Sequence, residues 1–258
     1  MQSLLNCNFH SLDFGSFVSP KAIPQMADTA AVLDRLDLSQ TPTKLLAIVA
    51  NVRGAMAACS HPEIDFLGYP FSISENFQMR NTHSTISQAI KVLSEILNLA
   101  DQSHKKVVVY LSMGFGNPYG DPWSTEIVQE WTARLAAMGV EILSLSDTVG
   151  SAHTTDIKAL FESLVPAYSN IEFGAHLHCK PQEWRDKIHT AYLAGCRRFD
   201  GAIQGFGGCP MAADALTGNM PTEKMLSYFS SQKIEHRVRW MAFEAAHNKA
   251  SAIFQKYH

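Results

Sequence analysis

The sequence lacks a long apolar run, a cluster of basic residues and an obvious set of paired cysteines. No apolar segment approaches the about 20 residues that a membrane-spanning helix needs, so we expect no membrane partner. Lysine and arginine (21 residues) are outnumbered by aspartate and glutamate (24 residues), and the formal net charge is −3. Because no basic stripe is present either, we expect no nucleic-acid partner.

The five cysteines are odd in number and follow no pairing pattern. Such a set favours free thiols in a reducing compartment. The first eight residues are too few and too polar for a signal peptide, so we expect a cytoplasmic protein. The chain also has no low-complexity tract and no linker, and we expect residues 1–258 to form a single domain.

Strand-like and helix-like segments alternate along the chain, which predicts an α/β protein with a parallel sheet. A chain of 258 residues with 46% hydrophobic residues can bury one large core and fits a barrel of the TIM (β/α)8 type. Seven stretches are predicted as strands: residues 9–15, 44–50, 64–71, 107–112, 141–147, 171–178 and 198–203.

Helices are predicted after the first, third, fourth, fifth and sixth of these strands and at the end of the chain, in about residues 222–229 and 234–255. The polar residues 72–77 are predicted to form a loop. The helix after the fifth strand is expected to end before Pro166, because proline disrupts a helix interior.

A glycine-rich loop with the sequence GFGGCP follows the seventh predicted strand, at residues 205–210. Glycines permit backbone conformations with positive φ. Main-chain N–H groups around an exposed thiol lower its pKa, so Cys209 is a candidate catalytic residue. The loop alone does not exclude an ordinary surface turn with an incidental cysteine.

His176 and His178 lie two residues apart on the sixth predicted strand. Because side chains alternate along a strand, both imidazoles face the same side and can reach one cation. A hydrogen-bonded histidine in the core is the alternative for either residue.

Two carboxylates, Asp13 and Asp147, come at the ends of the first and fifth predicted strands. In a (β/α)8 barrel the carboxyl ends of the strands form the active face, where these groups would meet His176, His178 and Cys209. Taken singly, a carboxylate at a strand end serves equally well in a turn.

Several blocks together resemble the 3-hydroxy-3-methylglutaryl-CoA lyase family. The specific block is the loop at 205–210 followed by Gly218-Asn219. Further blocks are similar to the family in the same order: FVSPK at 17–21, SENF at 74–77, DTVG at 147–150 and HLH at 176–178. The His-x-His pair is shared with a wider superfamily of metal-dependent lyases and synthases.

This resemblance implies cleavage of 3-hydroxy-3-methylglutaryl-CoA to acetoacetate and acetyl-CoA with Mg²⁺ or Mn²⁺. It implies His176, His178 and Asn219 as metal ligands, and an acyl-CoA substrate in a homodimer. Cys209 is expected to donate or shuttle a proton. Asp147 and His176 are further candidates for proton transfer, and Asp13 takes the place of a family glutamate.

The sequence departs from the family at its beginning. The family's first strand ends in an Arg-Asp pair, residues 1–8 contain neither type, and the first strand predicted here matches the family's second. We therefore expect a barrel without its first strand, with the gap covered by a partner chain or by rearrangement, and weak or absent activity.

Two smaller departures are Cys179-Lys180, where the family has Asp-Thr, and one extra residue before Asn219. A Claisen-type acyl-CoA synthase of the same superfamily is an alternative, which the glycine–cysteine loop disfavours. A non-catalytic binding protein derived from the barrel is the other.

Overall fold

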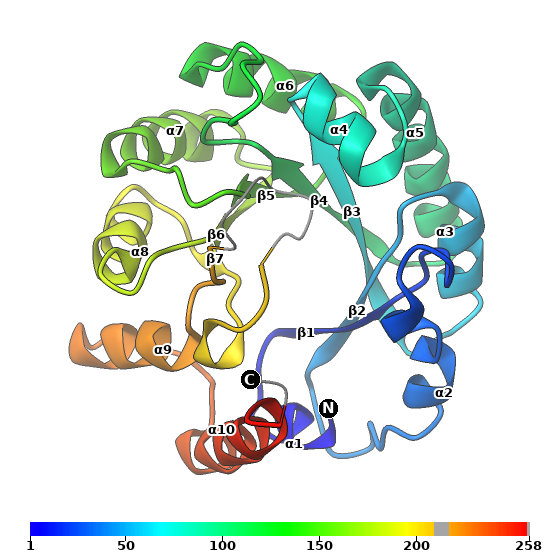
Figure 1. Cartoon of the computed structure of the whole chain (residues 1–258), viewed down its shortest axis with the longest axis vertical. Helices are drawn as coiled ribbons and strands as arrows, with labels where there is room; N and C mark the ends of the chain where they lie inside the picture. Colours follow the sequence, from blue (N-terminus) through cyan, green and yellow to red (C-terminus); the bar gives the residue numbers. More distant parts are fainter. Residues whose placement is uncertain (209–216, 257–258) are drawn as a thin grey trace.

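The computed structural model describes residues 1–208 and 217–256. Its centre is one parallel sheet in the order β1-β2-β3-β4-β5-β6-β7, so every strand pairs with the next strand in the sequence. The sheet curls into an incomplete barrel with the helices outside it (Figure 1). The strands are β1 (Ser11–Ser16), β2 (Lys44–Ile48), β3 (Ile64–Ser72), β4 (Lys106–Ser112), β5 (Ile142–Asp147), β6 (Glu172–Leu177) and β7 (Arg198–Phe199).

Helices connect successive strands, as parallel pairing requires. They are α2 (Thr29–Leu33), α3 (Val52–Cys59), α4 (Glu75–Thr82), α5 (Ile86–Gln102), α6 (Thr125–Ala137), α7 (Thr154–Ala167) and α8 (Trp184–Leu193). The chain continues with α9 (Thr222–Ser231) and α10 (Trp240–Phe254), and it begins with α1 (Gln2–Leu5). Two short 3₁₀ helices, η1 (Pro24–Met26) and η2 (Ile203–Gly205), complete the elements of the described part.

Local sequence signals explain where the longer helices start and stop. Thr85 and Gln88 form a reciprocal capping box at the start of α5, which satisfies two backbone donors. Gly139 follows α6 with φ +90° and Gly195 follows α8 with φ +101°, a conformation that glycine adopts without strain.

Two apolar clusters show which way the strand side chains point. Leu143 and Leu145 of β5 belong to the large core between the sheet and the helices. The alternate residue Ile142 packs with Phe66 and Val108 in a small cluster on the opposite face, inside the barrel. The alternation therefore separates an outer layer, which stabilises the fold, from an inner face that can present polar groups.

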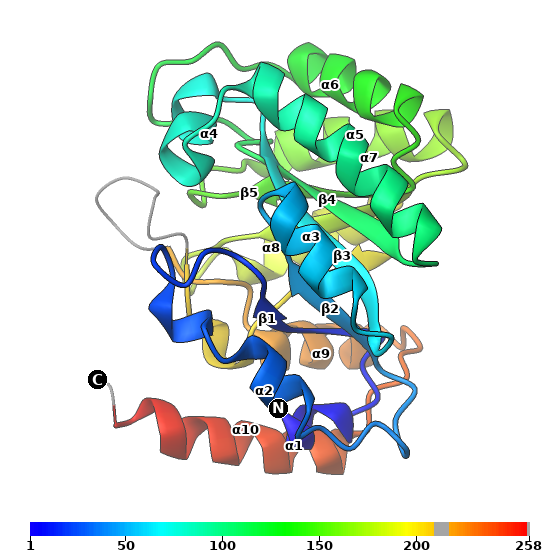
Figure 2. The ribbon, with the colours of Figure 1, turned by 90° about the vertical axis from the view of Figure 1, so that its right-hand side faces the viewer.

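The sheet is open between β1 and β7, since no pairing joins these two strands among the described residues. On this side of the molecule α1 lies beside α10 (Figures 1 and 2). Cys7, Leu226, Phe243 and Ala246 form a separate buried cluster there. The expectation of a barrel with seven strands is thus confirmed.

The structure corrects four details of the predicted elements. Helix α3 was not predicted, and α4 begins at Glu75, inside the stretch expected to be a loop. Helix α7 runs through Pro166 to Ala167. The last helix begins at Trp240 instead of about residue 234. No helix of the described residues is long and apolar enough to cross a membrane.

Candidate active site

The two histidines lie together at the carboxyl end of β6. His176 is the penultimate residue of the strand and His178 follows it directly. Their ring centroids are 5.6 Å apart, as the two-residue spacing predicts. In the parallel ladder His176 pairs with Ser146 of β5. Ser146 lies four residues after Ile142 of the inner cluster, so Ser146 and His176 both occupy the inner face of the barrel.

Asp200, just beyond β7, orients the His176 ring. His176 Nδ1 lies 3.2 Å from Asp200 Oδ2, and the Ser144 hydroxyl donates to the same oxygen at 3.2 Å. Burial alone would raise the pKa of Asp200, but the hydrogen bond from His176 and the charges of His176 and Arg198 outweigh it and lower that pKa. The rings of Tyr110 and His176 pack in a T-shaped arrangement with their centroids 5.2 Å apart.

His178 is held more tightly than His176. It is 4% exposed, and its Nδ1 donates to the Thr217 carbonyl at 3.1 Å. Burial, and secondarily the charge of His176, lower its pKa to about 4. The imidazole is therefore neutral at physiological pH, with the proton on Nδ1 and Nε2 left as an electron-pair donor.

Asn219 lies beside His178, because the two residues form an isolated antiparallel bridge. The Asn219 amide nitrogen Nδ2 donates to the Phe206 carbonyl at 2.8 Å, and the Asn219 backbone N–H donates to Gly205 at 3.0 Å. The first half of the glycine-rich loop thus fixes the amide and leaves its oxygen as an acceptor.

Gly207 is the position where this arrangement leaves no room for a side chain. Its φ is +93°, and an added Cβ would lie 2.8 Å from Asn219 Nδ2. We expect Gly207→Ala to displace the amide and weaken Mn²⁺ binding, at a stability cost of about 1–2 kcal/mol from the backbone. Gly120→Ala is the matched control, because Gly120 has φ +76° with nothing within 4 Å. Equal Mn²⁺ affinities in calorimetry would contradict this prediction.

Asp13 points into the barrel from β1, where it pairs with Leu46 of the inner cluster. Its pKa is raised to about 7, by burial and then by the negative charge of Asp200, while His176 opposes the shift. The Asp13 side chain keeps contact with solvent, and the negative charge of Asp200 acts on it across the inner face. Asp13, His176 and Asp200 therefore form one group on the inner face.

Asp147 does not join this group. It pairs with Leu177 on the outer face of the sheet, opposite to His176, and its carboxylate binds the buried Lys187 ammonium at 2.8 Å. The expectation that Asp147 faces the histidines across the barrel mouth is therefore wrong. Side chains on adjacent strand positions point to opposite faces, and Asp147 follows the inward-facing Ser146.

Cys209 lies outside the described residues, and its role stays a prediction that a thiol-labelling experiment can test. Burial raises the pKa of Cys179 to about 11 and that of Cys196 to about 12. At pH 8 we expect both to react with iodoacetamide at least about 100-fold more slowly than Cys209, because only the thiolate is nucleophilic. Peptide mass spectrometry after timed labelling measures the three rates. Equal rates would remove the case for an activated thiol at Cys209.

The predicted metal ligands fit one another chemically. Both histidines use Nδ1 in hydrogen bonds and keep Nε2, while Asn219 keeps its oxygen. Within residues 1–208 and 217–256, no three His, Cys, Asp or Glu side chains are grouped to hold a metal ion. The predicted set would add the Asn219 amide oxygen as third protein ligand, and oxygen ligands suit Mg²⁺ or Mn²⁺.

Asp200, Tyr110 and Lys187 were missed by the sequence analysis. Asp200 stands at a strand exit in the structure, but the predicted strand 198–203 placed it in a strand interior, so the signal that selected Asp13 did not reach it. Tyr110 and Lys187 carry no local signal, because each is recognised only by neighbours from other strands or helices.

A family model described as HMGL-like matches residues 17–249. The chain belongs to the HMGL-like family. A 3-hydroxy-3-isohexenylglutaryl-CoA/hydroxymethylglutaryl-CoA lyase of Pseudomonas aeruginosa is 31% identical over 248 residues, which cover 95% of this chain and 81% of that protein. A hydroxymethylglutaryl-CoA lyase of Bacillus subtilis is 28% identical over 228 residues, 88% of this chain and 75% of the relative.

Solved HMG-CoA lyase structures confirm the barrel. The Bacillus subtilis enzyme superposes with a TM-score of 0.90 at 27% identity, over 97% of this chain and 83% of its own. The Acinetobacter baumannii enzyme, in complex with coenzyme A and 3-methylmalate, superposes with a TM-score of 0.87 at 26% identity. This superposition covers 97% of this chain and 81% of that enzyme. The resemblance of this HMGL-like chain to HMG-CoA lyases therefore extends through the fold.

Proposed function

We propose that this chain is a divalent-metal-dependent carbon–carbon lyase that cleaves 3-hydroxy-3-methylglutaryl-CoA, or a close 3-hydroxyacyl-CoA, to acetoacetate and acetyl-CoA. The observation that carries the proposal is the pair His176 and His178, whose rings lie 5.6 Å apart at the carboxyl end of β6. Both rings use Nδ1 in a hydrogen bond, so Nε2 is the nitrogen that each would offer to a metal. Membership of the HMGL-like family and the lyase names of the relatives support it.

His176, His178 and Asn219 would hold Mg²⁺ or Mn²⁺ and leave positions for substrate oxygens. Such a cation supplies Lewis acidity, which makes the substrate's C3 hydroxyl more acidic. Asp200 fixes the ring of His176 through Nδ1, so that Nε2 keeps one direction.

Proton transfer in the proposed reaction needs an acceptor and a donor. Asp13, with a pKa of about 7, is suited to accept the C3 hydroxyl proton at neutral pH, with His176 beside it. The C2–C3 bond then breaks, its electron pair stays on the acetyl-CoA carbon, and that carbon takes a proton, for which we assign Cys209. Asp147 takes no part in this scheme, because it faces away from the barrel interior.

The test is an assay of the purified chain with 3-hydroxy-3-methylglutaryl-CoA and Mn²⁺, in which acetoacetate and acetyl-CoA are both measured. We expect cleavage that EDTA abolishes, because the proposed reaction depends on a divalent cation. Calorimetry with Mn²⁺ alone accompanies the assay. Metal binding without cleavage would reject the lyase activity. The absence of both metal binding and cleavage would favour a non-catalytic binding protein.

A parallel incubation of acetyl-CoA with 2-oxo acids, followed by release of free CoA thiol, tests the synthase alternative. We also propose that the chain forms one catalytic domain and acts as a homodimer in the cytoplasm. Sedimentation velocity measures the oligomeric state directly.

A further inference from the structure

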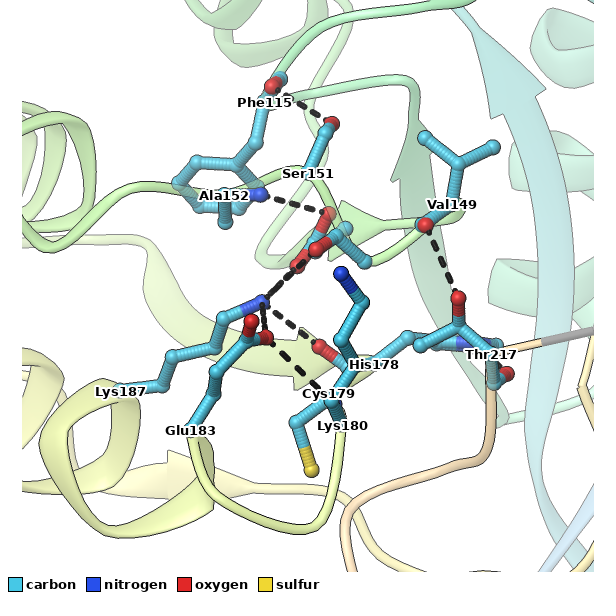
Figure 3. Close-up of polar contacts among 12 residues, drawn as sticks. Phe115, Val149, Ser151, Ala152, His178, Cys179, Lys180, Glu183, Lys187 and Thr217 are labelled. Carbon is cyan, nitrogen blue, oxygen red and sulfur yellow. Dashed lines mark hydrogen bonds and ion pairs between the residues drawn. The ribbon is translucent and has the colours of Figure 1, made fainter. Parts of the chain in front are cut away.

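Lys187 in α8 is a buried cation at the carboxyl ends of β5 and β6, and it is 3% exposed. Its ammonium donates to Asp147 Oδ2 at 2.8 Å, to the His178 carbonyl at 2.9 Å and to the Gly150 carbonyl at 3.1 Å (Figure 3). An ammonium has three N–H donors, and each of them has an acceptor here.

The three acceptors come from separate pieces of the chain. Asp147 ends β5, Gly150 belongs to the turn that follows it, and His178 comes directly after β6. One side chain from α8 therefore ties two neighbouring strand ends to the helix that covers them.

A second set of hydrogen bonds connects the turn after β5 to the His178 ring. Asp147 Oδ1 accepts from the Ala152 N–H at 3.1 Å. The Thr217 hydroxyl donates to the Val149 carbonyl at 3.2 Å, and the Thr217 carbonyl accepts from His178 Nδ1 at 3.1 Å. His178 is thus held at its backbone by Lys187 and at its ring by a residue attached to the same β5 turn.

Lys187 and Asp147 form a buried ion pair with no net charge. The Asp147 side chain is 0% exposed and that of Lys187 is 4% exposed. Glu183 Oε2 lies 3.7 Å from Lys187 Nζ on the side of the surface. A buried ion pair can often be replaced by apolar residues without loss of stability, so stability alone does not explain this one. What an apolar pair cannot supply is the bond to the His178 carbonyl.

We propose that Lys187, paired with Asp147, is a positioning residue that fixes the backbone of His178 and thereby aims its imidazole at the proposed metal site. The metal part of this inference rests on the proposed function, whereas the orientation of His178 does not. Asp147 then acts through Lys187 instead of exchanging protons with the substrate.

The experiment compares the wild type with the double variant Lys187→Met/Asp147→Leu, which removes both charges together. Histidine ¹⁵N NMR of the metal-free proteins, with His178→Gln for assignment, reports whether the His178 proton stays on Nδ1. We expect the double variant to lose this single tautomer and to bind Mn²⁺ about 10–100-fold more weakly in calorimetry, at similar thermal stability. The matched control is Lys106→Met/Glu141→Leu, which removes an exposed pair of a lysine and a carboxylate.

Unchanged His178 signals in the double variant would overturn the inference, whatever the metal data show. If the wild type itself binds no Mn²⁺, the proposed metal site fails, while the NMR comparison still decides the role of Lys187. Should the double variant not fold, Lys187→Arg replaces it. That variant keeps the charge but spreads the donors over a larger planar group, and we expect the same change in the His178 signals.

Discussion

Methionine in place of Lys187 alone is expected to lower the free energy of unfolding by about 3–5 kcal/mol. Methionine has nearly the same length as lysine, but the change removes the only cation that forms an ion pair with Asp147 among the described residues. The carboxylate would remain inside the protein with no opposite charge, and the carbonyls of Gly150 and His178 would lose a donor. Urea denaturation at neutral pH measures the loss.

Two comparisons show whether this loss comes from the uncompensated charge. Adding Asp147→Leu should restore most of the stability, because the unpaired carboxylate is then gone. Lys106→Met removes a cation from a pair whose side chains are both 61% exposed, and we expect it to cost less than about 1 kcal/mol. A loss below about 1 kcal/mol for Lys187→Met would show that this ammonium is not held in a buried pair.

Glutamine at His176 is expected to reduce Mn²⁺-dependent cleavage by about 10²–10⁴-fold. The change removes a proposed metal ligand and proton carrier, and it leaves Asp200 without the imidazole that lowers its pKa. The measurement is acetoacetate formation at saturating Mn²⁺, alongside Mn²⁺ titration of the variant.

His189→Gln is the control for this substitution. His189 lies on α8, where its Nδ1 meets the Tyr228 hydroxyl at 2.8 Å, away from β6. We expect wild-type cleavage in that variant. If both histidine variants kept wild-type rates, the assignment of His176 to the site would be wrong.

The strands and the histidine pair could be predicted because their signals are local. Apolar runs such as residues 44–50 and 107–112 define their own strands, and the spacing of His176 and His178 defines a shared face. Helix α3 was missed because Gly54 and three alanines leave few large apolar side chains to show a helical period. Its start does carry a local signal, since the Asn51 side chain accepts a hydrogen bond from the Gly54 N–H.

The environment of each site residue could not be predicted in the same way. Asp13 and Asp147 look alike in the sequence, as carboxylates at strand ends, and only the register of the sheet shows that one faces inward and the other outward. Likewise, Lys187 lies 40 residues from Asp147 in the chain, so their ion pair exists only after β5 and α8 have packed.

The pairing of each strand with its sequence neighbour has a consequence for how the protein assembles. Such a sheet can grow in chain order, because each step closes only a short stretch of polypeptide. The contact of α1 with α10 differs, since the Lys249 ammonium of α10 donates to the Ser3 hydroxyl of α1 across 246 residues. We therefore expect this helix pair to dock last during folding and to open first, which would make its amides the fastest-exchanging helical protons of the native protein.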